Sequence, residues 1–295
     1  QLLLKLNDIS DLTSGFSGTF SDVRSRFYGD HTGLNVAAFS QLELRPLDNL
    51  KAVAGVRLEH NRLDRLNDKL TPVFRAGLNW QVATLTFLRA SFGQGYRFPS
   101  VAEKFASTSL GSVRIFPNPD VKPESGWSSE IGIKQGLSLG QVSGQADMAV
   151  FISGNEDMIE YVFAYYTDPS GGDPDFGFQA DNVEQARVYG GEFEFTLDIK
   201  NGSLSTMVNG GYTFLYPVEY SSYGGNTGKY LKYRRKHSGK ISVLSSWKKL
   251  QAGLTLYARS KILNIDDVFL NPMTREDILP GFYDYWNLRN SAVFT

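Results

Sequence analysis

The sequence predicts an all-β fold, specifically part of an antiparallel transmembrane β-barrel, and three observations support this. The 295 residues include 20 Phe, 15 Tyr and 29 Gly, a composition typical of pleated sheets joined by many turns. The strand-like segments are mostly about 10–13 residues long, enough to cross a bilayer with tilt. Short and long connections alternate between these segments, as they do in membrane barrels.

Composition excludes several classes of function. The formal net charge is -1, which gives no reason to expect a nucleic-acid partner. The chain has no cysteine, so disulfides, thiolate metal sites and a Cys nucleophile are ruled out. No run approaches the roughly 18 apolar residues of a membrane helix. The first residues do not resemble a signal peptide, so we expect the numbering to begin inside a processed or trimmed chain.

The first 32 residues carry the weakest pattern. Gln1–Leu6 is typical of a strand end, and Thr13–Tyr28 indicates a polar loop with room for one further strand. Residues 1–32 therefore stay open between loop and strand.

After Gly33 the alternation of apolar and polar residues becomes clear. The cleanest example is Val188–Ile199, where Tyr189, Phe193 and Leu197 face one side while Glu192 and Glu194 face the other. A strand of this kind separates an apolar medium from a wet, charged one. Related segments predict about eleven to thirteen strands in all.

The order of connections separates a membrane barrel from a soluble sandwich, because barrels have short periplasmic turns and long outer loops. The short turns are predicted at Pro46–Asn49, Gln81–Ala83, Ser138–Gln141, Asn201–Gly202 and Lys248–Lys249. The long links are predicted at Asn61–Thr71, Gln94–Ser125, Gly154–Gln185, Pro217–Lys236 and Leu263–Phe282.

Aromatic residues gather near the ends of the predicted strands, which is typical of the girdles at the two membrane interfaces. They are Trp80, Phe92, Tyr96, Trp127, Tyr216, Trp247, Tyr283, Tyr285 and Trp286.

Two phrases and the residues around them resemble one known family. The first runs from Arg89 to Ser100 and contains Gly93-Gln94-Gly95-Tyr96-Arg97; the second is Asn118-Pro119-Asp120-Val121-Lys122-Pro123-Glu124, followed by Glu130-Ile131-Gly132. Together they resemble TonB-dependent outer-membrane receptors, in which a strand ending in such a phrase is followed by a loop and the next strand. The likeness extends from about Gly33 to Phe294.

The resemblance implies a barrel of about 22 strands whose lumen is blocked by an N-terminal plug domain. It also implies energy supplied by the TonB complex and a place in the outer membrane of a Gram-negative bacterium. We expect residues 1–295 to be the C-terminal part of such a barrel, without the plug. Its expected partners are the TonB complex, its own plug domain, outer-membrane lipid and, in addition, a surface lipoprotein.

No catalytic site, cofactor or metal site is expected. His31, His60 and His237 are scattered, without a paired Ser or acid at informative spacing. The loop Asp168–Asp175 is rich in carboxylates but lacks EF-hand spacing, so a solvated surface loop is the preferred interpretation and calcium the alternative.

Tyr and Arg side chains in the predicted loops suit capture of a bulky polar or anionic ligand. The candidates are Tyr96, Arg97, Tyr165, Tyr166, Tyr220, Tyr223, Tyr230 and Arg234, with Arg235 beside them. Polar residues predicted to line the lumen and hold the plug are Arg57, Glu59, Arg75, Glu130, Glu192 and Glu194.

The main hypothesis is an import receptor for a scarce nutrient, with a ferric siderophore as the first ligand, followed by cobalamin or a glycan. Haem-binding relatives carry a His between the two phrases, whereas Val101–Phe116 has none. A passive porin or structural outer-membrane barrel is the alternative. A soluble β-sandwich or lectin-like module is a third hypothesis, which requires the alternation of connections to be accidental.

Overall fold

The structure is a computed structural model that describes residues 1–110, 113–167, 171, 173–183, 185–221, 225–265 and 293–294. It is almost entirely β, with one short helix. The elements are β1 (Leu2–Asn7), β2 (Ser10–Ser25), β3 (Gly29–Leu47), β4 (Leu50–Leu63), β5 (Leu66–Asn67), β6 (Thr71–Ala83), β7 (Thr86–Arg97), α1 (Val101–Phe105), β8 (Thr108–Leu110), β9 (Val113–Phe116), β10 (Glu124–Leu139), β11 (Val142–Glu156), β12 (Ile159–Tyr166), β13 (Asp175–Asn182), β14 (Gln185–Asn201), β15 (Leu204–Ser221), β16 (Gly225–Tyr230), β17 (His237–Trp247), β18 (Leu250–Arg259) and β19 (Val293–Phe294).

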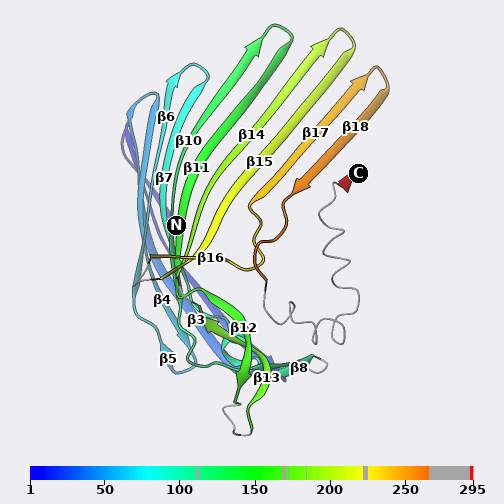
Figure 1. Ribbon diagram of the computed structural model, residues 1–295. Coiled ribbons are helices and arrows are strands. Elements are labelled where there is room, and N and C mark those ends of the chain that lie inside the picture. Colours follow the sequence, from blue (N-terminus) through cyan, green and yellow to red (C-terminus); the bar gives the residue numbers. More distant parts are fainter. Residues whose placement is uncertain are drawn as a thin grey trace.

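One large antiparallel sheet dominates the described part of the chain (Figure 1). Its strands follow the order β1-β2-β3-β4-β6-β7-β10-β11-β14-β15-β17-β18-β19, with β5 and β16 added beside β4 and β15. Each long strand therefore pairs with the next long strand along the chain, and the sheet curves into a trough without closing on itself. The predicted partial barrel of about eleven to thirteen strands is confirmed.

Of the two interpretations left open for Thr13–Tyr28, a polar loop or a further strand, the strand is correct over most of the range. β2 runs unbroken from Ser10 to Ser25 and pairs with β3 over its whole length. The pattern was faint because many residues of β2 are Ser, Thr or Gly, while the opposite face is marked chiefly by Phe16 and Phe20, which are 87% and 70% exposed. A strand in a sheet with one wet face needs few large apolar side chains.

The alternation of connections is confirmed from β3 to β18. The hairpin turns after β3, β6, β10, β14 and β17 lie at one end of the sheet, the top in Figure 1, and the long links lie at the other. Gly140, Gly202 and Lys248 open three of these two-residue turns with φ of 59°, 59° and 56°. A positive φ at the first central residue matches the twist of a tight hairpin. The last predicted link, Leu263–Phe282, lies mostly outside the described residues.

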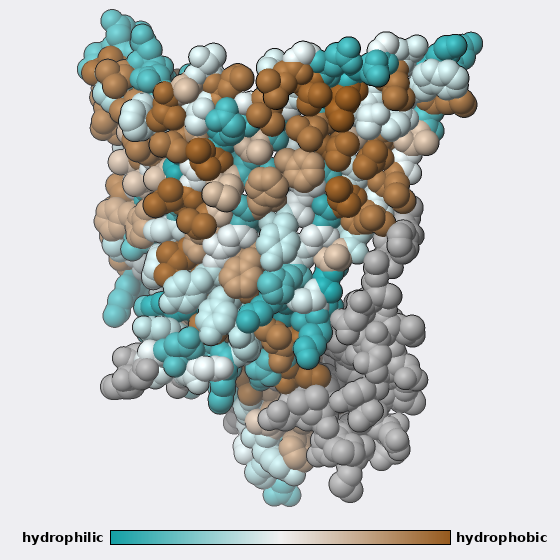
Figure 2. Space-filling view, turned by 45° about the horizontal axis from the view of Figure 1, so that its top comes forward, coloured by the Kyte–Doolittle hydropathy of each residue, from teal (hydrophilic) through white to brown (hydrophobic). Residues whose placement is uncertain are grey.

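The register divides the sheet into an apolar and a polar face. Phe193 pairs with Met148 and Tyr212, and Ile131 pairs with Val150. On this apolar face large side chains lie uncovered: Ile131 is 66% exposed, Val150 59% and Met148 54%. Figure 2 shows a hydrophobic belt across the half of the molecule near the short turns. Apolar side chains that no protein covers are expected where lipid is the solvent.

The predicted girdle residues divide between the two ends of the apolar face. Trp80 and Trp247 lie near the short turns, 42% and 51% exposed. Trp127 and Tyr216 lie toward the long links, whereas Phe92 lies in the middle of β7. Tyr283, Tyr285 and Trp286 lie outside the described residues. No helix in the described ranges is long and apolar enough to span a membrane.

On the apolar face, Gly144 lies where two strands approach too closely to leave room for a side chain. A Cβ on Gly144 would lie 2.1 Å from the Thr196 carbonyl oxygen in β14, a backbone atom that cannot move alone. Gly18, on the same face of β2, has no atom nearer than 3.8 Å to its ideal Cβ position.

We therefore expect Gly144→Ala to destabilise the barrel by about 1–3 kcal/mol, because the β11–β14 ladder must shift to admit the methyl group. Gly18→Ala is the matched control and should be neutral or stabilising by about 0.4–1 kcal/mol. Urea unfolding of the full receptor in lipid vesicles measures both. Equal stability of the two variants would contradict the role assigned to Gly144.

Candidate functional site

The end of the large sheet that carries the long links also carries a second sheet, of four strands, in the order β12-β13-β9-β8. Its strands come from two links, the one between β7 and β10 and the one between β11 and β14. β13 pairs with β9 in parallel, and Phe116 at the centre is only 1% exposed. Both links were expected to be loops; they are in fact ordered partly as strands that join each other.

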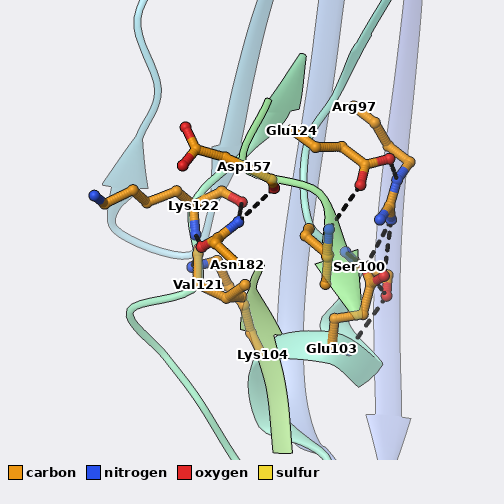
Figure 3. Close-up of polar contacts among 10 residues, drawn as sticks. Arg97, Ser100, Glu103, Lys104, Val121, Lys122, Glu124, Asp157 and Asn182 are labelled. Carbon is orange, nitrogen blue, oxygen red and sulfur yellow. Dashed lines mark hydrogen bonds and ion pairs between the residues drawn. The ribbon is translucent and has the colours of Figure 1, made fainter. Parts of the chain in front are cut away.

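The phrase that ends β7 forms an ion-pair knot with the phrase that begins β10 (Figure 3). Nη1 of Arg97 donates to both carboxylate oxygens of Glu103, at 2.9 and 2.8 Å, and its Nε donates to Oε1 of Glu124 at 2.5 Å. The other oxygen of Glu124 accepts the backbone N–H of Ile159, at 2.9 Å. One arginine thus connects the strand ends, the helix and the second sheet.

Helix α1 is set in place by a capping box. The Ser100 hydroxyl accepts from the Glu103 backbone N–H at 3.3 Å, while Oε2 of Glu103 accepts from the Ser100 backbone N–H at 2.8 Å. Burial alone would raise the pKa of Glu103, but the hydrogen bonds from Arg97 and Ser100 outweigh it and hold this pKa below its usual value.

Lys104 is buried, only 5% exposed, and holds the backbone of the second phrase, Asn118–Glu124, in place. Its Nζ donates to the carbonyl oxygens of Pro119 and Val121, at 2.6 and 2.7 Å. Burial lowers the pKa of Lys104, partly opposed by the nearby carboxylate of Asp120. The lysine gives buried carbonyls a partner that the prolines of this segment cannot supply.

Asn182 fastens the second phrase to the neighbouring link. Its Oδ1 accepts the Lys122 backbone N–H at 2.7 Å, and its Nδ2 donates to the carbonyls of Lys122 and Asp157, at 3.0 and 2.7 Å. The family-like phrases therefore form a structural brace under the long links (Figure 3).

The ligand candidates do not converge on one point. Tyr96 and Arg97 end β7, and Arg97 is occupied by its two carboxylates. Tyr165 and Tyr166 end β12, where Tyr165 lies 3.5 Å from the ring centre of Phe176.

The remaining candidates lie around β15–β17. The Tyr220 ring packs under Arg187 at 4.9 Å, and Tyr230 lies edge-on to Tyr216 at 5.5 Å. Arg234 is exposed. Tyr223 and half of the carboxylate-rich loop Asp168–Asp175, residues 168–170 and 172, lie outside the described residues. Among the described residues no cluster of potential metal ligands occurs.

The six residues predicted for the lumen share the polar face, as the register shows. Gly55 pairs with Arg75, Ser91 pairs with Glu130, and Ala149 pairs with Glu192. On this face Arg57 and Glu59 form an ion pair. The same face also carries Glu194, which is exposed next to Gly211.

Arg89 and Asp147 complete a polar-face ion-pair cluster that sequence reasoning missed. Nη1 of Arg89 donates to both oxygens of Asp147, at 2.6 and 2.8 Å, and its Nε donates to Glu130 at 2.8 Å. Both residues lie in long strands whose alternate residues are apolar. That pattern could have placed them on the polar face, but it could not have shown which charges pair.

The comparisons with known proteins agree with this architecture. A family model described as TonB dependent receptor-like, beta-barrel matches residues 4–289. No curated protein sequence matches the chain.

Three solved structures illustrate the likeness. The copper transporter OprC has a TM-score of 0.64 at 16% identity, over 87% of this chain and 41% of its own. A ferric enterobactin receptor mutant from Pseudomonas aeruginosa has a TM-score of 0.63 at 16% identity, over 86% and 39%. The siderophore receptor PirA from Acinetobacter baumannii has a TM-score of 0.59 at 14% identity, over 100% and 45%. The chain thus spans less than half the length of these structures, and at such identities they show the fold alone.

The knot predicts a pH dependence for the links. Because the pKa of Glu103 is held below its usual value, near 4.3, its stabilising effect is present above that value and is lost as pH falls through the lowered one. The hydrogen-exchange protection factors of residues 98–110 and 113–123 in the full receptor should therefore stay high from pH 7 to 5 and fall below about pH 4.

Arg97→Met tests the cause of this dependence. It should raise exchange at pH 7 and flatten the pH profile, because neither carboxylate keeps its partner. An Arg97→Met profile that coincides with the wild-type profile would contradict the knot. Arg24→Met, which breaks the exposed pair with Asp22, is the control and should change nothing in this segment.

Proposed function

The chain belongs to the family of TonB-dependent receptor β-barrels, and from this we propose that it is part of an outer-membrane receptor that binds a scarce nutrient outside the cell and imports it. The proposed location is the outer membrane of a Gram-negative bacterium. The observation that carries the proposal is that one molecule combines two features. Its sheet has an exposed apolar face suited to lipid, and at one end of the sheet the long links pair with each other as a second sheet. Long outer loops are common to membrane barrels, so the family match is what favours a receptor over a passive pore.

A ferric siderophore is the first ligand to test, with cobalamin or a glycan next. The proteins of similar fold include a siderophore receptor, a hemophore receptor in complex with hemophore and heme, and a copper transporter. The fold thus accommodates several kinds of cargo, and the choice for this chain rests on its own side chains.

Haem capture by histidine is disfavoured by the environment of His31. Its Nδ1 lies 2.7 Å from the Asp64 carboxylate and its Nε2 lies 2.6 Å from the Tyr28 carbonyl, while its ring stacks on Phe105 at 3.9 Å. Both ring nitrogens are therefore occupied and neither is free to bind iron. Of the His237 ring nitrogens, Nδ1 lies 2.7 Å from the Tyr212 hydroxyl.

Energy for import would come through the TonB complex, acting on a plug domain held in the lumen. We propose that polar-face side chains bind this plug, because charges that the plug covers lose their water and need a polar partner. These side chains are the predicted set Arg57, Glu59, Arg75, Glu130, Glu192 and Glu194. A surface lipoprotein is proposed as a further partner on the outer side. Transport, not catalysis, is the proposed activity.

The full-length receptor tests this proposal. Titration with ferric siderophores, haem and cobalamin should give saturable binding of one ligand, and cells should import that ligand only when TonB is present. The alternative, a passive porin, predicts steady ion conductance in planar bilayers and import independent of TonB. That outcome would overturn the receptor assignment. Tight haem binding that depends on His31 or His60 would overturn only the argument against haem capture.

A further inference from the structure

Positive charge is concentrated in one arc of the barrel wall. Between Tyr220 and Ile265 the sequence has ten Lys and Arg and no Asp or Glu. The rest of the chain holds the other twenty Lys and Arg together with all 31 Asp and Glu. A formal net charge of -1 therefore conceals a strongly basic segment within an acidic chain.

This segment forms β16, β17 and β18. In the large sheet β17 pairs with β18, while β16 pairs with the end of β15 nearer the long links (Figure 1). Lys248 and Lys249 make the short turn between β17 and β18. The other eight cations lie in the half toward the long links: Lys229, Lys232, Arg234, Arg235, Lys236, Lys240, Arg259 and Lys261. The basic arc is thus weighted toward the rim where a ligand from outside would enter.

Two of these cations lie on the polar face over a shared hollow. Lys240 pairs in register with Tyr257, and Ser238 pairs with Arg259. The Lys240 ammonium lies 5.4 Å from the centre of the Tyr257 ring. Polar side chains of β14 and β15 line the same hollow, namely Glu194, Asn209 and Thr213.

Lys240 and Arg259 differ from the two paired arginines of the polar face. Arg89 is held by two carboxylates and Arg57 by one. Within the described part of the chain neither Lys240 nor Arg259 forms an ion pair, and both are exposed. Asn209, Thr213 and Ser238 also make no side-chain hydrogen bond to another described residue. Glu194 adds one negative charge, so the hollow keeps an excess of positive charge.

We propose that this hollow, bounded by Lys240, Arg259, Tyr257 and Ser238, binds a small anionic, oxygen-rich ligand at the mouth of the lumen. Unpaired cations in a concave wall raise the local concentration of anions. Arg presents a planar fork and Lys a mobile point charge, a combination suited to carboxylate, catecholate or phosphate oxygens. The inference rests on the proposed receptor function and names the ligand class and its site.

The test uses the full-length receptor and a pair of ferric chelates, a negatively charged tricatecholate complex and an uncharged trihydroxamate complex. K240Q/R259Q should weaken binding of the tricatecholate complex by about ten- to hundredfold and reduce its dependence on salt. K248Q/K249Q makes the same charge change at the opposite end of the same two strands and should bind as the wild type does.

Three results would overturn the inference. K240Q/R259Q could bind the tricatecholate complex with wild-type affinity. The wild type could bind and import only the uncharged complex, which would leave the receptor function standing and refute the anionic ligand class. K240Q/R259Q could instead lower thermal stability and release the plug while binding stays intact, which would assign the cations to an acidic segment of that domain. Absence of saturable binding and TonB-dependent import for every ligand would refute the receptor function itself.

Discussion

The structure depends on one constraint, that a backbone crossing lipid must pair its own N–H and C=O groups. The long strands meet it by continuous antiparallel ladders. β14 pairs with β15 from Gln185–Tyr220 to Asn201–Leu204 without a register shift, and β10 pairs with β11 in the same way. Because the ladder satisfies the backbone, alternate side chains are left to meet two different solvents. The exposed apolar face and the charged polar face both follow from this arrangement.

The polar side chains divide into groups with different physical roles. In the arc from β3 to β11 several charges neutralise each other, as Arg89 does with Glu130 and Asp147. At the rim, Arg97 and Lys104 use their charges to hold the links, the first against carboxylates and the second against carbonyl oxygens. In the arc from β16 to β18 cations exceed acids, and it is there, at Lys240 and Arg259, that we place the proposed ligand site. The position of a charged side chain in the wall, more than its residue type, therefore decides whether it stabilises the fold or stays available for binding.

Sequence reasoning predicted most of the large sheet, because period two and the order of connections are local properties. It left β2 open between loop and strand, because the wet face of this strand is built largely from Ser, Thr and Gly, and it treated β12 and β13 as loop. The run Ile159–Tyr166 has strong strand composition, but its partner is β13, and the further pairing of β13 with β9 joins residues about sixty positions apart. Pairing over such a separation leaves no local pattern. For the same reason the sequence offered Arg97 as a ligand candidate, although the fold commits it to Glu103 and Glu124.

The central claim, a wall with lipid on one face and water on the other, can be measured along β14. The chain has no cysteine, so single cysteines placed in turn from Tyr189 to Ile199 in the full receptor can be labelled one at a time. Reaction with a membrane-impermeant thiol reagent should be fast at even positions, where Glu192 and Glu194 lie. Fluorophores at odd positions, where Phe193 and Leu197 lie, should be quenched by nitroxide lipids. A profile without this two-residue period, or with the two phases exchanged, would contradict the account.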